Sequence, residues 1–323
     1  MVRKKIAIDA GKYMTKVVMA TSGNPVDDLT WSFRTRIEEK TGFASDNATT
    51  VKYNGKEYIV GGKSSKSADG EHSSSKNTLT HKICILTAIA HMVSKVSNGS
   101  EIIEIDACIG CPLDIYGNKT SRSEFLNNML PIGETITVNL NGKEISFTVG
   151  NARVLPESSG IIYLNGKKYR DAIVVVCDGG GLNYNTAMFQ DLQIVPDQLF
   201  TSELGSYSLN SALADWLVTE KGMDRAKLAD NVLEKAIKDG KLNRVEGSEQ
   251  AIKEIKLKTC RALKDACDAQ KIDITLTELV FTGGTSLLLK PEIKEVFGVD
   301  DSVFYEDAVF ANARGFLNFI RRK

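Results

Sequence analysis

The sequence predicts an α/β fold built as two related halves, and three observations lead to this prediction. Strand patterns dominate the first half of the chain, and helical patterns become frequent in the second half. The segment IAIDAG at residues 6–11 reappears as VVCDGG at residues 175–180, close to half the chain length later. The 323 residues are enough for two domains that each bury an apolar core.

The individual elements follow from local patterns. Short apolar strands are expected at residues 5–9 and 16–21, joined by a glycine-bearing turn, and again at 175–178 and 186–189. Asn-Gly pairs at 54–55, 141–142 and 165–166 predict hairpins, because a type I′ turn needs positive φ at both central residues. Apolar residues at three- and four-residue spacing predict helices over 79–96, 204–221, 225–239 and 249–269. We expect a surface loop at 64–77, a strand at 278–282 and a helix from Ser286.

Composition excludes several classes of protein. Lysine plus arginine and aspartate plus glutamate both number 41, so a broad nucleic-acid-binding surface is not expected and any contact with DNA is indirect. Zero net charge permits self-association. The chain has no secretory signal and no apolar run of about 20 residues, which predicts a cytoplasmic protein without a membrane span.

The cysteines and histidines are not expected to carry chemistry. Six scattered cysteines indicate reduced thiols, and the pair Cys108 and Cys111 is interpreted as a buried strand end. His72, His81 and His91 fit no metal-binding motif, so we expect them at the surface or hydrogen bonded.

Two matching turns suggest the ligand. Asp9 and Asp178 each follow an apolar strand and are followed by glycines, Gly11 in one copy and Gly179, Gly180 and Gly181 in the other. Glycine lets backbone N–H groups approach phosphate oxygens, and an Asp carboxylate suits Mg²⁺ that keeps several waters. The repeat therefore predicts a nucleoside triphosphate with Mg²⁺, bound between the two halves.

Two further segments are candidates for the same site. Gly283, Gly284 and Thr285 follow the predicted strand 278–282, where glycines allow a base and ribose to lie against the backbone; alone, the segment is also an ordinary strand-to-helix turn. Glu157, in the segment PESSG at 156–160, would orient a water for attack on the γ-phosphate. The alternative for Glu157 is a solvated acid at the start of a helix, which the helix dipole favours.

In this ordered set of motifs, the chain resembles the superfamily of actin, sugar kinases and heat-shock chaperone ATPases. Within it, the chain is similar to the ParM-type actin-like proteins that segregate bacterial plasmids. The matching segments are DAGKYMTK at 9–16, CPLDIY at 111–116, PES at 156–158, DGGG at 178–181, ELG at 203–205, GGT at 283–285 and ANARG at 311–315.

The resemblance implies a fold, a site and an activity. It implies an actin-like (ribonuclease H-like) two-domain fold, with domain I at 1–156 plus 308–323, a small outer subdomain at about 22–78, and domain II at 157–307. It implies that Asp9, Gly11, Lys12, Tyr13, Gly179, Gly180, Gly181, Gly205, Gly283, Gly284 and Thr285 hold ATP or GTP, and that Asp9 and Asp178 hold Mg²⁺ through water. Glu157, with Asp178, is implied as catalytic.

Departures from the family pattern fall in the phosphate loops. Lys12 and Tyr13 stand where hydroxyl residues are usual, and Leu182, Asn183 and Asn185 replace the usual Thr-Thr and closing Asp of the second loop. We interpret Lys12 as a compensating charge for the phosphates.

The leading hypothesis is a filament-forming ATPase with an adaptor protein that joins the filament to a plasmid centromere, as the resemblance implies. One alternative is a sugar-type kinase of the same fold, although Glu157 favours water as the nucleophile. Another is a nucleotide-gated scaffold with little turnover, which the altered second loop permits. A chaperone is weaker, because no substrate domain follows Lys323.

Overall fold

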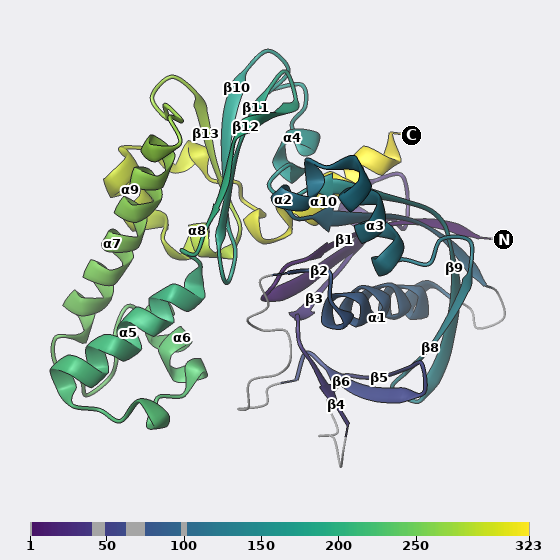
Figure 1. The fold of residues 1–323 in the computed structure, drawn as a ribbon, viewed down its shortest axis with the longest axis horizontal. Coiled ribbons are helices and arrows are strands. Elements are labelled where there is room, and N and C mark those ends of the chain that lie inside the picture. Colours follow the sequence, from purple (N-terminus) through teal and green to yellow (C-terminus); the bar gives the residue numbers. More distant parts are fainter. Residues whose placement is uncertain (1, 41–48, 63–74, 98–101, 323) are drawn as a thin grey trace. The chain divides into compact units, whose positions relative to one another are not determined.

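The computed structural model describes residues 2–40, 49–62, 75–97 and 102–322. Most of the loop expected at 64–77 lies outside these residues, as does His72. The chain divides into two compact units, the first formed by residues 1–165 and 310–323 and the second by residues 166–309 (Figure 1). The boundaries predicted from the sequence, after residues 156 and 307, fall shortly before those of the units and remain a prediction as domain boundaries.

The first unit is built on one sheet. Among the described residues it has nine strands in the order β3-β2-β1-β7-β9-β8-β5-β6-β4. β1 pairs with β7 and β7 with β9 in parallel, whereas the other pairs are antiparallel. The strands are β1 (Arg3–Ala10), β2 (Met14–Met19), β3 (Leu29–Arg34), β4 (Ile37–Glu39), β5 (Thr49–Tyr53), β6 (Lys56–Val60), β7 (Ile103–Cys111), β8 (Thr135–Leu140) and β9 (Lys143–Pro156).

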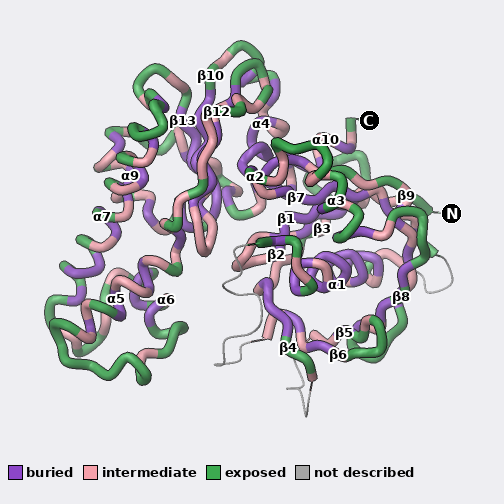
Figure 2. The backbone as a smooth tube through the Cα atoms, in the orientation of Figure 1, coloured by how far each residue is buried: buried purple, intermediate pink, exposed green. Residues whose placement is uncertain are grey.

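The helices of the first unit cover both faces of this sheet. They are η1 (Pro25–Asp27), α1 (Leu79–Val96), α2 (Leu113–Tyr116), α3 (Lys119–Met129), α4 (Gly160–Leu164) and α10 (Ala311–Arg321). Successive side chains of a strand point to opposite faces. Ile6 and Ile8 of β1 pack in the core that contains α1, whereas Ala7 packs in the core that contains Phe316 of α10. β1 is therefore buried on both sides (Figure 2).

The second unit has a four-stranded sheet in the order β12-β11-β10-β13, in which only β10 and β13 are parallel. Its core joins β10 and β13 to the helices α5, α7 and α9. The elements are β10 (Ile173–Gly179), β11 (Tyr184–Gln190), β12 (Gln193–Ser202), α5 (Ser206–Lys221), η2 (Arg225–Lys227), α6 (Asp230–Asp239), α7 (Ser248–Ala269), β13 (Glu278–Thr282), α8 (Gly284–Leu288), α9 (Lys290–Phe297) and η3 (Asp301–Val303). The turn η4 (Ala308–Phe310) lies at the boundary with the first unit.

The predicted internal repeat is confirmed. In both units a central strand pairs antiparallel with the next strand and parallel with a later one: β1 with β2 and β7, and β10 with β11 and β13. The registers also correspond, because Asp9 lies opposite Lys16 and Asp178 lies opposite Asn185. The two turns thus occupy equivalent places in two copies of one strand plan.

Two of the three predicted Asn-Gly hairpins are confirmed. Asn54 and Gly55 join β5 to β6, and Asn141 and Gly142 join β8 to β9, all with positive φ. The prediction for Asn165 and Gly166 was wrong. Asn165 has φ −112° and ends helix α4, because its N–H bonds to the carbonyl of Ile161.

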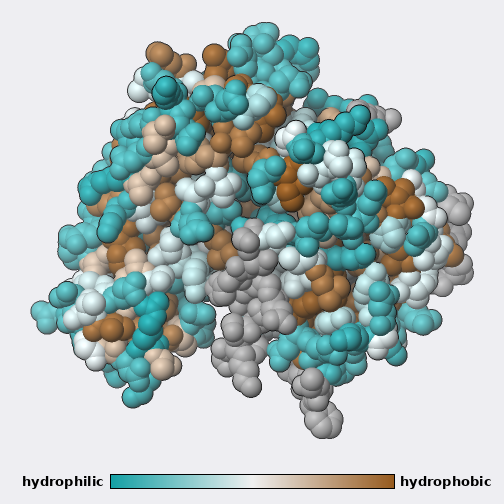
Figure 3. Space-filling view, in the orientation of Figure 1, coloured by the Kyte–Doolittle hydropathy of each residue, from teal (hydrophilic) through white to brown (hydrophobic). Residues whose placement is uncertain are grey.

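The helix predictions need smaller corrections. Residues 79–96 form α1 as predicted, and α5 and α7 begin within two residues of the expected positions. The helix expected over 225–239 is interrupted, since η2 ends at Lys227 and α6 starts at Asp230. The last of these helices, α8, begins at Gly284 rather than Ser286. No helix within the described residues is both long enough and apolar enough for a membrane span. Figure 3 shows hydrophilic and hydrophobic residues interspersed on one face.

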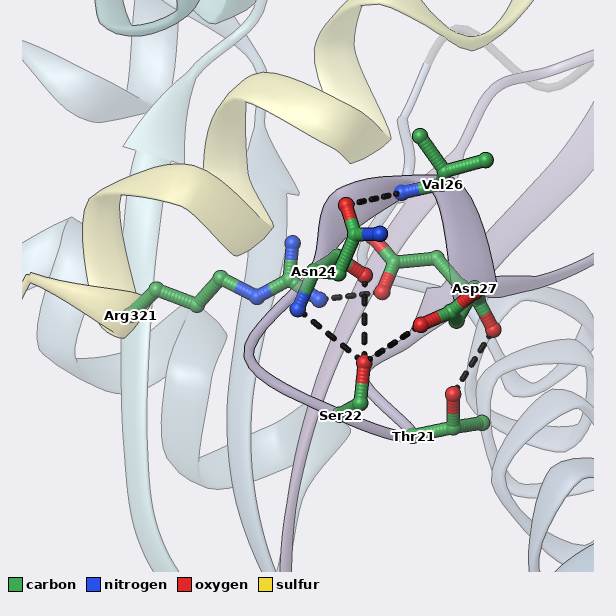
Figure 4. Close-up of polar contacts among 7 residues, drawn as sticks. Thr21, Ser22, Asn24, Val26, Asp27 and Arg321 are labelled. Atoms are coloured by element: carbon green, nitrogen blue, oxygen red, sulfur yellow. Dashed lines mark hydrogen bonds and ion pairs between the residues drawn. The ribbon is translucent and has the colours of Figure 1, made fainter.

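The C-terminal helix α10 makes polar contacts with the rest of the first unit at both of its ends. At its start, Gly160 of α4 donates from its N–H to Asn312 Oδ1 at 3.3 Å. At its end, Arg321 pairs with Asp28, whose side chain is 3% exposed and which precedes β3. Figure 4 shows Arg321 reaching the turn where Ser22 donates to Asp27 and Asn24 accepts from the N–H of Val26.

Two glycines allow α4 and α10 to touch. A Cβ at Gly315 would lie 2.0 Å from the carbonyl oxygen of Gly160, and one at Gly160 would lie 2.4 Å from the carbonyl oxygen of Ala311. Contacts this short have no room for a methyl group, so the helices would have to separate.

We predict that Gly315→Ala destabilises the protein, although Ala is usually the better residue inside a helix. The clash with Gly160 should cost about 1–3 kcal/mol in the free energy of unfolding, measured by denaturant titration. Gly117→Ala is the matched control, because no atom lies within 4 Å of a Cβ at that position. A Gly315→Ala protein as stable as the parent would contradict the close helix contact.

Candidate functional site

The turn of the first unit, residues 11–13, joins β1 to β2. Gly11 donates from its N–H to the carbonyl of Met14 at 3.0 Å, and a Cβ at Gly11 would lie 2.9 Å from that same oxygen. Lys12 is partly exposed, and the ring of Tyr13 lies 3.6 Å below the guanidinium of Arg34. The N–H of Gly11 therefore closes the turn between β1 and β2.

Asp9 is a buried carboxylate held by cations. Its side chain is 6% exposed, and Oδ2 accepts a hydrogen bond from Lys16 Nζ at 2.9 Å. Burial on its own would raise the pKa of Asp9, but the charges of Lys16 and Lys76 and hydrogen bonds from Lys16 and Asn312 lower it below the usual value. Asp9 is therefore ionised at neutral pH.

Glu157 lies immediately after β9 and is 4% exposed. Its N–H donates to the carbonyl of Cys111 at 3.0 Å, and its carboxylate pairs with the buried ammonium of Lys76. The next residue, Ser158, has φ +68°, and Ser159 Oγ donates to the Pro156 carbonyl at 2.6 Å. The alternative of a solvated acid at a helix start was wrong, because this tight turn places Glu157 in the interior.

Gly110 lies between the two acids. A Cβ at this position would be 3.5 Å from Asp9 Oδ1 and 3.8 Å from Glu157 Cγ. The structure therefore brings Asp9 and Glu157 together around one point at the end of β7. Neighbouring Cys111 and Cys108 are buried free thiols, as predicted, and burial raises the pKa of Cys111 to about 12.

The turn of the second unit is assembled from three segments. Gly180 donates from its N–H to the carbonyl of Asn183 at 2.8 Å, as Gly11 does to Met14 in the first unit. The N–H of Gly205 donates to Leu182 at 3.2 Å, and Thr285 Oγ1 donates to the carbonyl of Gly180 at 2.7 Å. The predicted residues Asp178, Gly179, Gly180, Gly181, Gly205, Gly283, Gly284 and Thr285 thus lie in one cluster.

Close backbone packing explains most glycines of this cluster. A Cβ at Gly283, where φ is +83°, would lie 2.6 Å from Asp178 Oδ1, and one at Gly205 would lie 2.4 Å from the carbonyl oxygen of Gly181. Gly284 differs, since no atom lies within 4 Å of a Cβ there and the residue is exposed. Packing therefore leaves the space beside Gly284 open for a ligand. Asn185, which replaces the family's Asp, accepts a hydrogen bond from Thr201 at 2.8 Å.

The donor set fits Mg²⁺ of the kind that nucleotides carry. Among the described residues, no group of three or more His, Cys, Asp or Glu side chains is arranged to hold a metal ion. Mg²⁺ does not need such a cage, because it often binds one or two carboxylates, water and the substrate phosphates. Ionised Asp9 is the carboxylate at the first turn that could serve such an ion, and Asp178 is the equivalent carboxylate at the second turn.

Sequence reasoning missed Lys16, Lys76, Gly110 and His81. Lys16 was detectable, because hairpin register places it directly opposite Asp9. Lys76 lies near the end of the polar stretch 64–77, where nothing in the pattern indicates a buried ammonium.

His81 was expected to be exposed or hydrogen bonded, and this was only half right. His81 is 1% exposed; Nδ1 lies 2.8 Å from Thr78 Oγ1, while Nε2 has no partner among the described residues. His91, by contrast, is partly exposed and stacks on Trp31 with ring centroids 3.9 Å apart.

Comparisons with known proteins agree with this geometry. Residues 7–160 match the family model described as the actin-like proteins N-terminal domain. No match is found among the sequences of curated proteins. The solved structures of similar fold include a 15-stranded ParM filament from Clostridium botulinum, with 17% identity, TM-score 0.77 and 100% of both chains covered.

Two more solved structures show the same likeness. An archaeal actin homologue in complex with ADP has 18% identity and TM-score 0.72, with 100% of both chains covered. The filament structure of Alp12 has 22% identity and TM-score 0.69, covering 99% of this chain and 98% of that one.

The chain has the actin-like fold. These matches confirm the predicted α/β architecture, and they confirm the resemblance to ParM and other actin homologues at the level of the fold.

We predict that His81 makes stability sensitive to acid. Burial, together with the charges of Lys76 and Lys12, lowers the pKa of His81 from 6.5 to about 3. The unfolded chain therefore binds a proton at higher pH than the folded chain, so stability is full above pH 6.5 and falls as pH drops towards 3.

The size of this effect follows from about 1.4 kcal/mol per pH unit, which gives a loss of about 2 kcal/mol between pH 7 and pH 5. Denaturant titration at both pH values measures it. In His81→Gln, which does not titrate, this part of the loss should vanish. An identical pH dependence in both proteins would show that His81 is not buried and neutral.

Proposed function

We propose that this chain is an actin-like, filament-forming ATPase that binds ATP or GTP with Mg²⁺ and belongs to the ParM-type plasmid-segregation proteins. The observation that carries this proposal is the convergence of two buried carboxylates, Asp9 and Glu157, around Gly110 beside the first glycine turn. An ordinary strand turn does not require buried acids, since burying charge is costly.

The phosphates would be held by both turns. The first supplies Gly11, Lys12 and Tyr13, and the second supplies Gly179, Gly180 and Gly181, with Mg²⁺ linked to Asp9 and Asp178 through water. The open space beside Gly284 supports a base lying against Gly283, Gly284 and Thr285, with Gly205 near the ribose. The ADP bound by the archaeal actin homologue supports nucleotide as the ligand class.

Hydrolysis would depend on Glu157. Its carboxylate accepts a proton or orients water, and its buried, fixed position beside Asp9 supports a role at the γ-phosphate. Asp178 would assist through the metal. Mg²⁺, when bound, supplies positive charge that stabilises the charge developing on the phosphates.

Self-association is the proposed output of nucleotide binding. Filament structures of ParM from Clostridium botulinum and of Alp12 have a similar fold. We further propose that a centromere-binding adaptor protein joins the filament to plasmid DNA in the cytoplasm, because zero net charge disfavours direct DNA binding and no membrane contact is needed.

Sedimentation with phosphate release tests this function. Purified protein should pellet as filaments with ATP-Mg²⁺ or GTP-Mg²⁺, stay soluble with EDTA, and release phosphate without any added acceptor. Absence of filaments by electron microscopy would reject an actin-like function. Phosphate transfer that requires an added sugar would instead indicate a kinase, and filaments without phosphate release would indicate a scaffold.

We predict that Glu157→Gln slows phosphate release by about 100-fold or more while filaments still assemble with ATP, because the amide cannot accept the proton. Glu144→Gln is the control, since Glu144 is exposed in β9 and should keep full turnover. Release at the parent rate in Glu157→Gln would remove Glu157 from the mechanism.

Lys12 offers a second test of the nucleotide site. If its ammonium compensates for the missing hydroxyls, Lys12→Ala should weaken ATP binding by about tenfold, as expected for loss of one charge-assisted contact. The measurement is a fluorescent-nucleotide titration at fixed Mg²⁺. An unchanged affinity for ATP in Lys12→Ala would contradict the compensating role of Lys12.

A further inference from the structure

Lys76 carries a buried charge between the two acids of the first unit. The side chains of Lys76 and Glu157 are 6% and 5% exposed, and Lys76 Nζ contacts Glu157 Oε1. Lys76 also lies close enough to Asp9 to help lower the pKa of that carboxyl, after the opposing effect of burial and the stronger effect of Lys16. One ammonium therefore interacts with both acids.

The four charged groups around this point balance one another. Asp9 and Glu157 face Lys16 and Lys76, so two negative groups meet two positive groups in the interior. A structural ion pair of this kind is often no better than apolar packing. A polyphosphate arriving beside Asp9 would add negative charge, which Lys76 could balance by moving from Glu157 to the polyphosphate.

His81 provides a second and independent indication of an anion. Thr78 Oγ1 caps helix α1 by accepting from the N–H of His81 at 3.3 Å, and its hydroxyl lies 2.8 Å from His81 Nδ1. If the hydroxyl donates to Nδ1, the proton of the neutral ring is on Nε2. That N–H is buried without a partner among the described residues, a costly state that a ligand acceptor would relieve.

We propose that Lys76 and His81 recognise the terminal phosphate of a nucleoside triphosphate and that Lys76 moves from Glu157 to this phosphate when it binds. The inference rests on the proposed nucleotide site and adds two positioning residues to it. His81 donates from Nε2 to the same phosphate. The move frees a carboxylate oxygen of Glu157 to hold water, so Glu157 becomes competent only when a triphosphate is present.

This exchange makes the first unit discriminate between triphosphate and diphosphate. The diphosphate lacks the group that competes with Glu157, so Lys76 returns to its ion pair after hydrolysis. A static structural ion pair would give no such discrimination, because it would contribute equally to both nucleotide states.

The test compares dissociation constants for Mg²⁺ complexes of ADP and of a non-hydrolysable ATP analogue with a bridging nitrogen. The reference is the ratio of the dissociation constant for ADP to that for the analogue, measured in the unsubstituted protein. Lys76→Met should reduce this ratio by about tenfold or more through loss of analogue binding, and His81→Gln by about threefold or more. Lys52→Met, at an exposed position in β5, is the matched control and should leave the ratio unchanged.

Glu157→Gln should change the affinity for the analogue in the opposite direction. This second test does not require the Lys76→Met protein to fold. Weakening the pair releases Lys76, so analogue binding should tighten by about threefold or more while ADP binding stays the same. In Lys76→Met/Glu157→Gln this gain should disappear. A parental ratio in Lys76→Met, or no gain in Glu157→Gln, overturns the inference, whereas a parent that binds neither nucleotide overturns the proposed function itself.

Discussion

The constraint on which the site depends is the burial of the Asp9 carboxylate at the end of a strand covered on both faces. β1 has Ile8 against the α1 side of the core and Ala7 against the α10 side, so the chain cannot move Asp9 towards solvent without opening one of them. A buried, ionised carboxylate requires nearby cations, and Lys16 and Lys76 provide them for Asp9. The turn from Gly11 to Tyr13 is positioned by the same strand.

Glu157 is brought to this place by a different part of the fold. Parallel pairing of β7 with β1 and with β9 aligns the ends of the three strands, so residues that follow them meet at one edge. Gly110 leaves the space that both carboxylates need, and the turn at Ser158 directs Glu157 inwards. The close contact of Gly160 with Gly315 then holds α10 behind the turn, which explains why a C-terminal helix belongs to the N-terminal unit.

Local pattern predicted the parts of this structure that local physics determines. The repeated Asp-x-Gly strands, the hairpins at Asn54 and Asn141, and the helix over 79–96 depend on nearby residues, and all were found. The hairpin at Asn165 failed because α4 and its packing decide that backbone, and the break after Lys227 has no proline to signal it. Lys76 and Gly110 act through contacts between distant segments, which spacing along one sequence does not encode. Glu157 was a candidate on sequence, but only its burial removed the alternative of a solvated acid.

Calorimetric titration of ATP into the protein, with and without Mg²⁺, tests most directly the claim that Asp9 is the centre of a nucleotide site. The parent should bind one ATP in a manner that requires Mg²⁺, and Asp9→Asn should bind at least about tenfold more weakly, because the neutral amide loses its charge-assisted contacts. Equal, Mg²⁺-independent binding in the two proteins, or no binding in the parent, would contradict the account.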